Sequence, residues 1–387
     1  MAADIIGGSD DSRWATLTAA VEGDIAAGLY FGGNILVSRG GKPLYGRTFG
    51  HSAEDKKRPV APDSVFSLFS VTKALTNLLV FRAIEKGQLT LTTPIHRIIP
   101  EFSGGLRNRI TVFHLLTHST GVPSIYCPKP GMFIDRLDEI ISAICEVAYP
   151  VEQPGSRVDY SPMVNHALMG EAVRRLDPAK RPYRQIMAED LFEPLGMKST
   201  SMGLRKDLKA RHLVPEFRGN YPISHLGHSN LGPNGAFEEE HAEMPWVGCV
   251  STAPDMLRFT EMLRQGGTLD GHRVVSTALV DAARTIWTGD KPNEFYASLI
   301  RANNGIVLPG NLGLGFSIRG SGMGTSMFGT LASPGTFGAH GAGTTLFWVD
   351  PERDLSFVGL MTGLMTTYDN LERWQRLCDL AILAASG

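Results

Sequence analysis

The chain has 387 residues, of which 43% are hydrophobic and 20% are charged, and its formal net charge at pH 7 is -2. This composition is typical of a globular protein long enough to bury a large core. The balanced charge provides no basic surface for nucleic acid or an anionic membrane, so we expect neither as a partner.

The cysteines and the N-terminal residues argue against several further classes of protein. Cys127, Cys145, Cys249 and Cys378 lack C-x-x-C spacing and nearby histidine pairs, which argues against a zinc site or a disulfide framework. Residues 1–11 contain acidic side chains and no basic region followed by an apolar core, and no segment reaches the roughly 18 apolar residues of a membrane span. Unless a leader has been removed from the chain, we therefore expect a cytoplasmic protein without a metal or cofactor. The oligomeric state stays open.

The first elements in chain order are a helix, two strands and a second helix. Residues 13–28 have the apolar spacing of an amphipathic helix. Residues 33–38 and 44–50 read as strands, and Gly40 and Gly41 between them supply the positive dihedrals of a hairpin turn. Residues 64–69 are strand-like. A helix containing Ser70 follows them and is expected to end at a glycine cap, Gly87.

The middle of the chain, residues 89–263, reads as helical segments separated by long polar loops. Helices are predicted at residues 112–118, 136–147, 163–176 and from a capping box at 252–255 to the glycine pair at 266–267. Strands return near the end at residues 315–318, 344–349 and 355–361, and residues 369–385 close the chain as a helix.

Short connections between neighbouring strands imply antiparallel pairing. The sequence therefore predicts an α+β fold: one antiparallel sheet flanked by the terminal helices, with a mostly helical domain inserted. Residues 1–88 and 268–387 would form the sheet domain and residues 89–267 the inserted domain, with the active site at their junction.

The segment Ser70-Val71-Thr72-Lys73 places a serine and a lysine on one helical face. A lysine near the buried start of a helix loses solvation and feels the positive end of the helix dipole, and both effects lower its pKa. A neutral lysine beside a serine can help the hydroxyl attack a carbonyl, so Ser70 is a candidate nucleophile. The bland alternative is a surface helix with a capping serine and a solvated lysine.

Two further segments supply what such a nucleophile needs. Tyr160 lies at a turn before a helix and could relay a proton with Lys73, although a merely packed tyrosine is an equally simple interpretation. Residues 340–343 are a small, glycine-rich stretch, and the backbone N–H of Gly343 with that of Ser70 would give two oxyanion donors. The alternative for this stretch is an ordinary glycine-rich turn.

Four segments in this order resemble the signature segments of the beta-lactamase-related serine hydrolases. They are Ser70-Val71-Thr72-Lys73 and residues 114–121, 191–197 and 251–259. That family includes class C beta-lactamases, D-alanyl-D-alanine peptidases, family VIII carboxylesterases and lovastatin-type acyltransferases, and the similarity covers roughly residues 15–385. The resemblance implies the two-domain fold. It implies Ser70 as the nucleophile, Lys73 and Tyr160 as the proton-relay pair, and Gly343 in the oxyanion hole.

Two departures from the family pattern bear on the substrate. Pro162 stands where the tyrosine motif usually has an asparagine, which removes a polar contact to an amide substrate. His340 stands where lactamases and peptidases usually have a lysine that attracts a substrate carboxylate, and histidine is mostly neutral near pH 7. Both changes favour small neutral esters over beta-lactams and peptidoglycan stems.

The expected pocket wall comes from several loops, with His340, Gly341, Tyr126, Trp246 and Phe316 as the candidate substrate-binding residues. The remaining histidines give weaker evidence for a functional site. His225, His228 and His241 have no helical ligand spacing and are interpreted as loop histidines. His114 and His118, one helical turn apart, are expected to hold their helix and the adjoining loop by hydrogen bonds.

We therefore expect a serine carboxylesterase that works through an acyl-enzyme on Ser70, with a small-molecule ester as its partner. Acyl transfer to an alcohol or amine in place of water is the alternative nearest in chemistry. An amidase, a beta-lactamase or a catalytically silent binding module that kept the fold would also fit the sequence. The acyl and alcohol groups that the pocket accepts stay open at this point.

Overall fold

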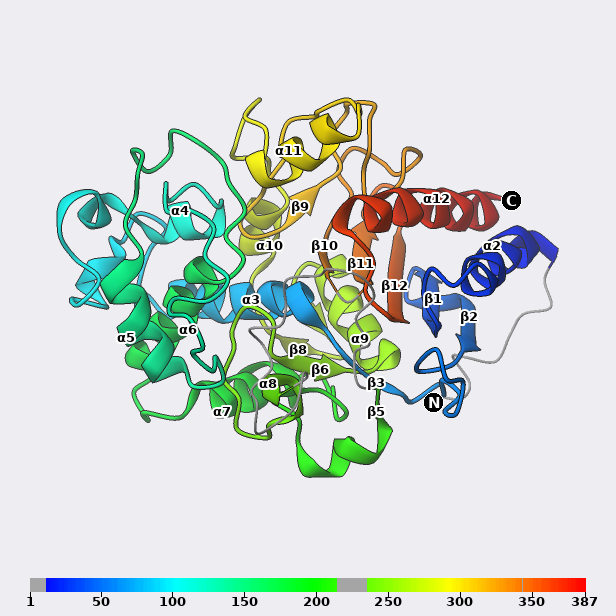
Figure 1. The fold of residues 1–387 in the computed structure, drawn as a ribbon, viewed down its shortest axis with the longest axis horizontal. Helices are drawn as coiled ribbons and strands as arrows, with labels where there is room; N and C mark the ends of the chain where they lie inside the picture. Colours follow the sequence, from blue (N-terminus) through cyan, green and yellow to red (C-terminus); the bar gives the residue numbers. More distant parts are fainter. Residues whose placement is uncertain (1–11, 214–234, 343) are drawn as a thin grey trace.

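The computed structural model describes residues 12–213, 235–342 and 344–387. Its main sheet has six strands in the order β2-β1-β12-β11-β10-β9, and every neighbouring pair is antiparallel. Both ends of the chain therefore build one sheet (Figure 1). Its strands are β1 Gly32–Arg39, β2 Lys42–Gly50, β9 Ser317–Ile318, β10 Phe337–Gly341, β11 Thr345–Asp350 and β12 Leu355–Thr362. The predicted α+β fold class is confirmed.

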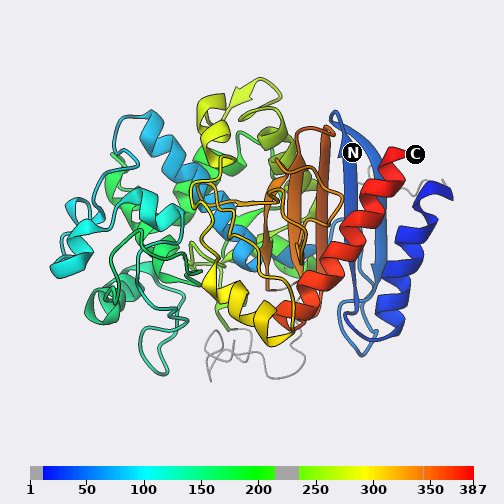
Figure 2. The ribbon, with the colours of Figure 1, turned by 90° about the horizontal axis from the view of Figure 1, so that it is seen from above.

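Alternating side chains place this sheet between two hydrophobic layers. Ile35 and Val37 of β1 pack into the cluster under helices α2 Ala15–Ala26 and α12 Thr367–Ser386, while Leu36 between them faces the larger central cluster. Figure 2 shows α2 and α12 together on one side of the sheet, with most of the other helices on the opposite side. The sheet is buried on both faces, so the predicted cover by the terminal helices is confirmed.

The remaining helices lie mostly on the other side of the sheet, around α3 (Figure 1). They are α3 Thr72–Glu85, α4 Val112–Leu116, α5 Leu137–Val147, α6 Val164–Leu176, α7 Tyr183–Met187, α8 Gly235–Glu238, α9 Ala253–Arg264, α10 Thr277–Ala283 and α11 Glu294–Ala302. Short helical turns add η1 Ser12–Trp14, η2 Phe69–Val71, η3 Ile95–Arg97, η4 Gly105–Arg109, η5 Ala188–Phe192 and η6 Lys206–Arg211. None of the described helices combines the length and apolar character that crossing a membrane requires.

Several local predictions are confirmed. Gly40 and Gly41 have φ of 56° and 77° in the β1–β2 turn, and Gly87, with φ of 68°, follows α3 and donates its N–H to the carbonyl of Ile84. Thr252 caps α9 by accepting the N–H of Asp255 at 3.3 Å. These positions could be predicted because each depends on a few neighbouring residues.

Other predictions need correction. The middle of the chain also contributes to a small second sheet in the order β4-β6-β3-β5. The sequence indicated β3, within the strand-like residues 64–69, but not the other three strands, because each is only two or three residues long. The strands of this sheet are β3 Val65–Ser67, β4 Ser201–Met202, β5 His212–Leu213 and β6 Cys249–Ser251, and a separate hairpin joins β7 Thr268–Leu269 to β8 His272–Arg273. Strand β10 was also missed, since three of its five residues are glycine or alanine. The limits of the two predicted domains stay a prediction.

Candidate active site

Ser70 lies in the tight turn η2, directly after β3 and before α3. The preceding residue, Phe69, has φ of 49°, a left-handed conformation that is uncommon for an aromatic side chain. Packing holds it there: its ring lies 4.8 Å from that of Phe237, and the carbonyl of Leu68 accepts a hydrogen bond from Thr345 Oγ1 at 2.9 Å. The backbone around Ser70 is therefore fixed by contacts from helix α8 and from strand β11 of the main sheet.

Lys73, one turn further along, is buried with 4% of its surface exposed. Its Nζ lies 3.0 Å from Ser70 Oγ and donates to the carbonyl oxygen of Trp246 at 3.0 Å. No carboxylate among the described residues forms an ion pair with it. Burial without a counter-charge lowers the pKa of Lys73 well below its usual value of 10.5, which favours a neutral amine.

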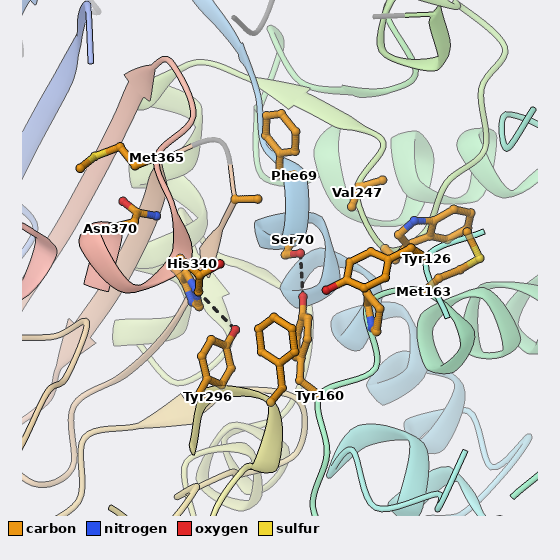
Figure 3. A pocket seen from close by; sticks show the side chains of 15 residues that line it. Phe69, Ser70, Tyr126, Tyr160, Met163, Val247, Tyr296, His340, Met365 and Asn370 are labelled. Carbon is orange, nitrogen blue, oxygen red and sulfur yellow. Dashed lines mark hydrogen bonds between the residues drawn. The ribbon is translucent and has the colours of Figure 1, made fainter. Parts of the chain in front are cut away.

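Tyr160 comes from the loop before α6, and its hydroxyl donates to Ser70 Oγ at 2.7 Å (Figure 3). Its backbone is held at both ends: the N–H donates to Asn293 Oδ1 at 3.1 Å, and the carbonyl accepts from Ser124 Oγ at 3.1 Å. Lys73 Nζ lies 5.1 Å from the centre of the Tyr160 ring. The structure thus brings the three residues of the predicted relay together around one serine oxygen.

His118 helps to hold Tyr160 and the residue after it in place. Its Nδ1 accepts the N–H of Ser161 at 2.9 Å, and its ring lies 5.0 Å from that of Tyr160. Burial lowers the pKa of His118 to about 3, so the imidazole is neutral at pH 7. His114 accepts the N–H of Thr111 at 3.1 Å. Both histidines therefore organise helix and loop by hydrogen bonds, as the sequence predicted.

Strand β10 passes close beside the Ser70 turn. A Cβ added to Gly341 would lie 2.5 Å from the Leu68 carbonyl oxygen and 2.5 Å from Thr345 Oγ1, so only glycine fits at this crossing. Gly343, the predicted second oxyanion donor, lies outside the described residues. His225 and His228 lie outside them too.

A pocket with about 740 Å³ of empty space opens in front of Ser70, and we call it the front pocket. It is lined by Phe69, Ser70, Tyr126, Tyr160, Pro162, Met163, Trp246, Val247, Phe295, Tyr296, His340, Ala342, Met365, Thr367 and Asn370. Aromatic and aliphatic groups dominate this wall, and the described part of it contains no lysine, arginine, aspartate or glutamate (Figure 3). Such a surface suits an uncharged ligand.

His340 brings no charge to the front pocket. Burial, more than the nearby Lys73, lowers the pKa of His340 to about 4, so its ring is neutral at pH 7. Its Nε2 lies 3.4 Å from the hydroxyl of Tyr296 (Figure 3). The predicted pocket residues Tyr126, Trp246 and His340 all line this space.

Phe316 is a correction to the expected wall. It is fully buried in the central core, with its ring 5.8 Å from that of Phe337 and 6.5 Å from that of Phe347. The strand β9 that follows it is short, and Phe316 turns inward where the sequence suggested a pocket-lining loop. Gly341 does not line the front pocket. Its lack of a side chain lets β10 approach the Ser70 turn.

Sequence reasoning missed two groups of wall residues. Phe295 and Tyr296 begin α11, and their rings lie 5.5 Å and 5.7 Å from that of Tyr160. Met365 lies two residues before α12, and Thr367 and Asn370 belong to its first turn. The sequence offered one signal for Phe295 and Tyr296 as wall residues, namely that two aromatic residues stand next to each other shortly after Asn293. Within the described ranges, no set of three or more His, Cys, Asp or Glu side chains is placed to hold a metal ion.

Comparisons with known proteins agree with this geometry. The family model described as Beta-lactamase matches residues 17–381. Protein Rv1367c of Mycobacterium tuberculosis is 30% identical over 366 residues, which is 87% of this chain and 86% of that protein. Protein flp of Staphylococcus aureus is 27% identical over 220 residues, but the match covers 54% of this chain and only 43% of the relative.

Solved structures share the fold over almost the whole chain. A penicillin-binding protein homologue from Caulobacter crescentus has a TM-score of 0.77 at 25% identity, covering 98% of this chain and 99% of that one. EstCE1, a hydrolase with promiscuous acyltransferase activity, has a TM-score of 0.74 at 20% identity, covering 98% and 99%. A family VIII carboxylesterase also has a TM-score of 0.74, at 18% identity, covering 96% and 99%. The chain therefore belongs to the beta-lactamase family, within the serine hydrolase superfamily that also contains penicillin-binding proteins.

Proposed function

We propose that this protein is a serine carboxylesterase that cleaves small neutral esters through an acyl-enzyme on Ser70. One observation carries the proposal: the cluster of Ser70, Lys73 and Tyr160 opens on a pocket whose described wall contains no ionised side chain. A substrate carboxylate would lose its hydration there without gaining a partner. An uncharged ester carries no such cost.

The reaction begins with removal of the Ser70 proton. Neutral Lys73, 3.0 Å away, accepts it directly or through Tyr160, whose oxygen is 2.7 Å from Ser70 Oγ. Ser70 Oγ attacks the ester carbonyl, and the N–H groups of Ser70 and Gly343 are proposed to stabilise the oxyanion. Tyr160 then protonates the leaving alcohol.

The second half of the reaction uses the same groups. The Lys73 and Tyr160 pair removes a proton from water, and the water oxygen attacks the acyl carbonyl. Ser70 Oγ leaves and receives a proton from the pair, which releases the free acid and restores the starting state. No cofactor takes part in this scheme.

Pro162 also supports an ester over an amide. It lines the front pocket at the position where the resembling family places an asparagine, and it has neither an amide side chain nor a backbone N–H. A substrate amide would therefore lack a hydrogen-bond partner at this point of the wall. Hydrolysis of small neutral esters is the chemistry that best fits both Pro162 and His340.

The test is intact-protein mass measured after mixing with a short-chain nitrophenyl ester or a fluorophosphonate. We expect an adduct on Ser70, loss of adduct and turnover in Ser70→Ala, and no change in Ser321→Ala, whose side chain is exposed. Absence of any adduct would favour a catalytically silent binding module. Hydrolysis of nitrocefin as fast as the nitrophenyl ester would favour a beta-lactamase.

Acyl transfer is the second candidate, favoured by the likeness to EstCE1, which is described as a hydrolase with promiscuous acyltransferase activity. Water and an acceptor alcohol would compete for the same acyl-enzyme. A single-turnover reaction with added alcohols separates the two: formation of free acid alone would exclude transfer.

A further inference from the structure

Two more hollows adjoin the reacting residues. The first, which we call the inner chamber, has about 420 Å³ of empty space and a wall that includes Ser70, Lys73, His118, Tyr160, Asn293 and Ser317. The second, which we call the side pocket, has about 670 Å³ and lies among α11, β9 and α12, with a wall that includes Ile300, Leu308, Leu312, Ile318, Phe328 and Leu371. Both walls expose more apolar than polar surface, and the reacting groups Ser70, Lys73 and Tyr160 line only the chamber of these two.

The inner chamber and the side pocket have a common wall. Asn293, Tyr296, Leu312 and Ser317 line both. Tyr296 also lines the front pocket (Figure 3), so this residue borders all three spaces. A ligand in the side pocket would therefore have one end beside residues that also line the inner chamber.

The junction contains polar groups that the protein does not use. Asn293 is 6% exposed, and its Oδ1 accepts the Tyr160 N–H, which fixes the orientation of the amide. Its Nδ2 donates to no partner among the described residues, and neither does the hydroxyl of Ser317. Both residues border the chamber, so the oxygen of a hydroxyl-bearing ligand there can accept a hydrogen bond from Asn293 Nδ2.

The side pocket has no free ionic group to prefer an acid or an amine. Arg319 is the only charged residue in its described wall, and it is 5% exposed. The guanidinium donates to the backbone carbonyls of Gly320, Gly322, Gly329 and Thr330 at 2.6–3.0 Å. Arg319 therefore holds a loop together, and the space beside it suits an alkyl chain.

We propose that the side pocket and the inner chamber form an acceptor site for a primary aliphatic alcohol. The alkyl chain fills the side pocket, and the hydroxyl enters the chamber beside Asn293, Lys73 and Tyr160. The acyl group meanwhile occupies the front pocket. This inference rests on the proposed acyl-enzyme and adds the place and the class of the second substrate.

The transfer step is balanced without any further reactant. The alcohol oxygen bonds to the acyl carbonyl carbon while its proton passes to the Tyr160 and Lys73 pair. The bond from that carbon to Ser70 Oγ breaks, and Ser70 Oγ receives a proton from the pair. The products are a new ester and free Ser70, and nothing is oxidised or reduced.

The test measures the ratio of new ester to free acid from a nitrophenyl butyrate donor with methanol, 1-butanol or 1-hexanol at equal concentration. Both products come from one acyl-enzyme, so the ratio does not depend on how fast Ser70 is acylated or how much protein is folded. We expect the ratio to rise with chain length in the unmodified protein. Leu308→Trp, which fills the side pocket, should lower the hexanol ratio about tenfold, the worth of roughly two buried methylenes, and change the methanol ratio less than about twofold.

Leu331→Trp is the matched control, because Leu331 is 41% exposed and lies outside the described wall of the side pocket, and its ratios should not change. If Leu308→Trp does not fold, Leu308→Phe and the chain-length series of the unmodified protein give the same answer. Equal ratios for methanol and hexanol, or a hexanol ratio unaffected by filling the pocket, would overturn the acceptor site. Free acid and a Ser70 adduct without any new ester would overturn it while leaving the esterase intact. Absence of acid, ester and adduct would reject both.

Discussion

The two sides of Ser70 are built on different principles. On the inner side, Lys73, Tyr160 and the Trp246 carbonyl are placed by hydrogen bonds of 2.7–3.0 Å, and His118 lies beneath them with a lowered pKa. On the outer side, the front pocket has an aromatic and aliphatic wall with few polar contacts. Reactivity is therefore set by a few buried polar groups, and selectivity by shape and the absence of charge.

This difference has a consequence for substitutions. A change on the inner side alters a protonation state or a hydrogen bond on which bond breaking depends, so it should affect kcat strongly. A change in the wall alters contacts with the substrate, which are worth about 0.8 kcal/mol per methylene. The following predictions begin with substitutions on the inner side and end with substitutions in the pocket wall.

Lys73→Met should have the largest effect. The thioether fills the same space without an amine, so no base remains beside Ser70, and we expect kcat for a nitrophenyl ester to fall at least about 10³-fold. Lys73→Arg should fail equally, because a guanidinium stays protonated in proteins. Circular dichroism checks the fold of both variants. Retention of activity within about tenfold in either variant would show that Lys73 is not the base.

Gly341→Ala tests the contact between β10 and the Ser70 turn. The new methyl group would meet the Leu68 carbonyl and Thr345 Oγ1 at 2.5 Å, so the strand must move away. We expect kcat to fall roughly 10- to 100-fold and the free energy of unfolding to fall by about 1–3 kcal/mol. Gly23→Ala in α2, where nothing lies within 4 Å, is the control and should stabilise the protein by about 0.5–1 kcal/mol. Unchanged kcat and KM in Gly341→Ala would show that the contact between β10 and the Ser70 turn does not affect catalysis.

His340→Lys tests whether the front pocket selects for neutral substrates. Adding an ammonium group should raise kcat/KM for a carboxylate-bearing ester by about tenfold relative to a neutral ester of the same size. His340→Gln, which adds no charge, should leave this preference as it is. Equal kcat/KM values for the two esters in the unmodified protein would contradict the proposed selectivity.

Met365→Ala should have the smallest effect. Shortening this side chain enlarges the front pocket, so kcat/KM should change between about twofold and tenfold, in favour of longer acyl chains. Met323→Ala is the matched control, since Met323 is 67% exposed and outside the described wall. A uniform change across all chain lengths in Met365→Ala would mean that the acyl chain lies elsewhere.

Most of the longer helices, the long strands and the Ser70, Lys73 and Tyr160 cluster could be predicted because their signals are local or come from segments of a known family. Helices α7, α8, α10 and α11 were not predicted. The helix caps at Gly87 and Thr252 could be predicted from the neighbouring residues alone. The lowered pKa of Lys73 could be predicted from its place near the buried start of a helix. His340 was correctly expected to be neutral, since histidine needs a nearby carboxylate to stay charged at pH 7.

The pocket wall could not be predicted from local signals. Phe316 and Phe295 are both phenylalanines in loop-like surroundings, yet one packs in the core and the other faces Tyr160. The choice depends on tertiary contacts, of Phe316 with Phe337 in β10 and of Phe295 with Tyr160, that no sequence window contains. Strands β4, β5 and β6 of the second sheet escaped prediction for the same reason, because pairing over two or three residues leaves almost no periodic pattern.

The pH dependence of Ser70 acylation tests the central claim most directly. If burial lowers the pKa of Lys73, the neutral base is already present well below pH 10.5, and acylation declines only when the pH falls through that lowered pKa. Stopped-flow bursts with a nitrophenyl ester should therefore reach their plateau rate well below pH 10.5. The same bursts should be lost in Lys73→Met. A rate that keeps rising up to about pH 10.5, as for a solvated lysine, would contradict the account.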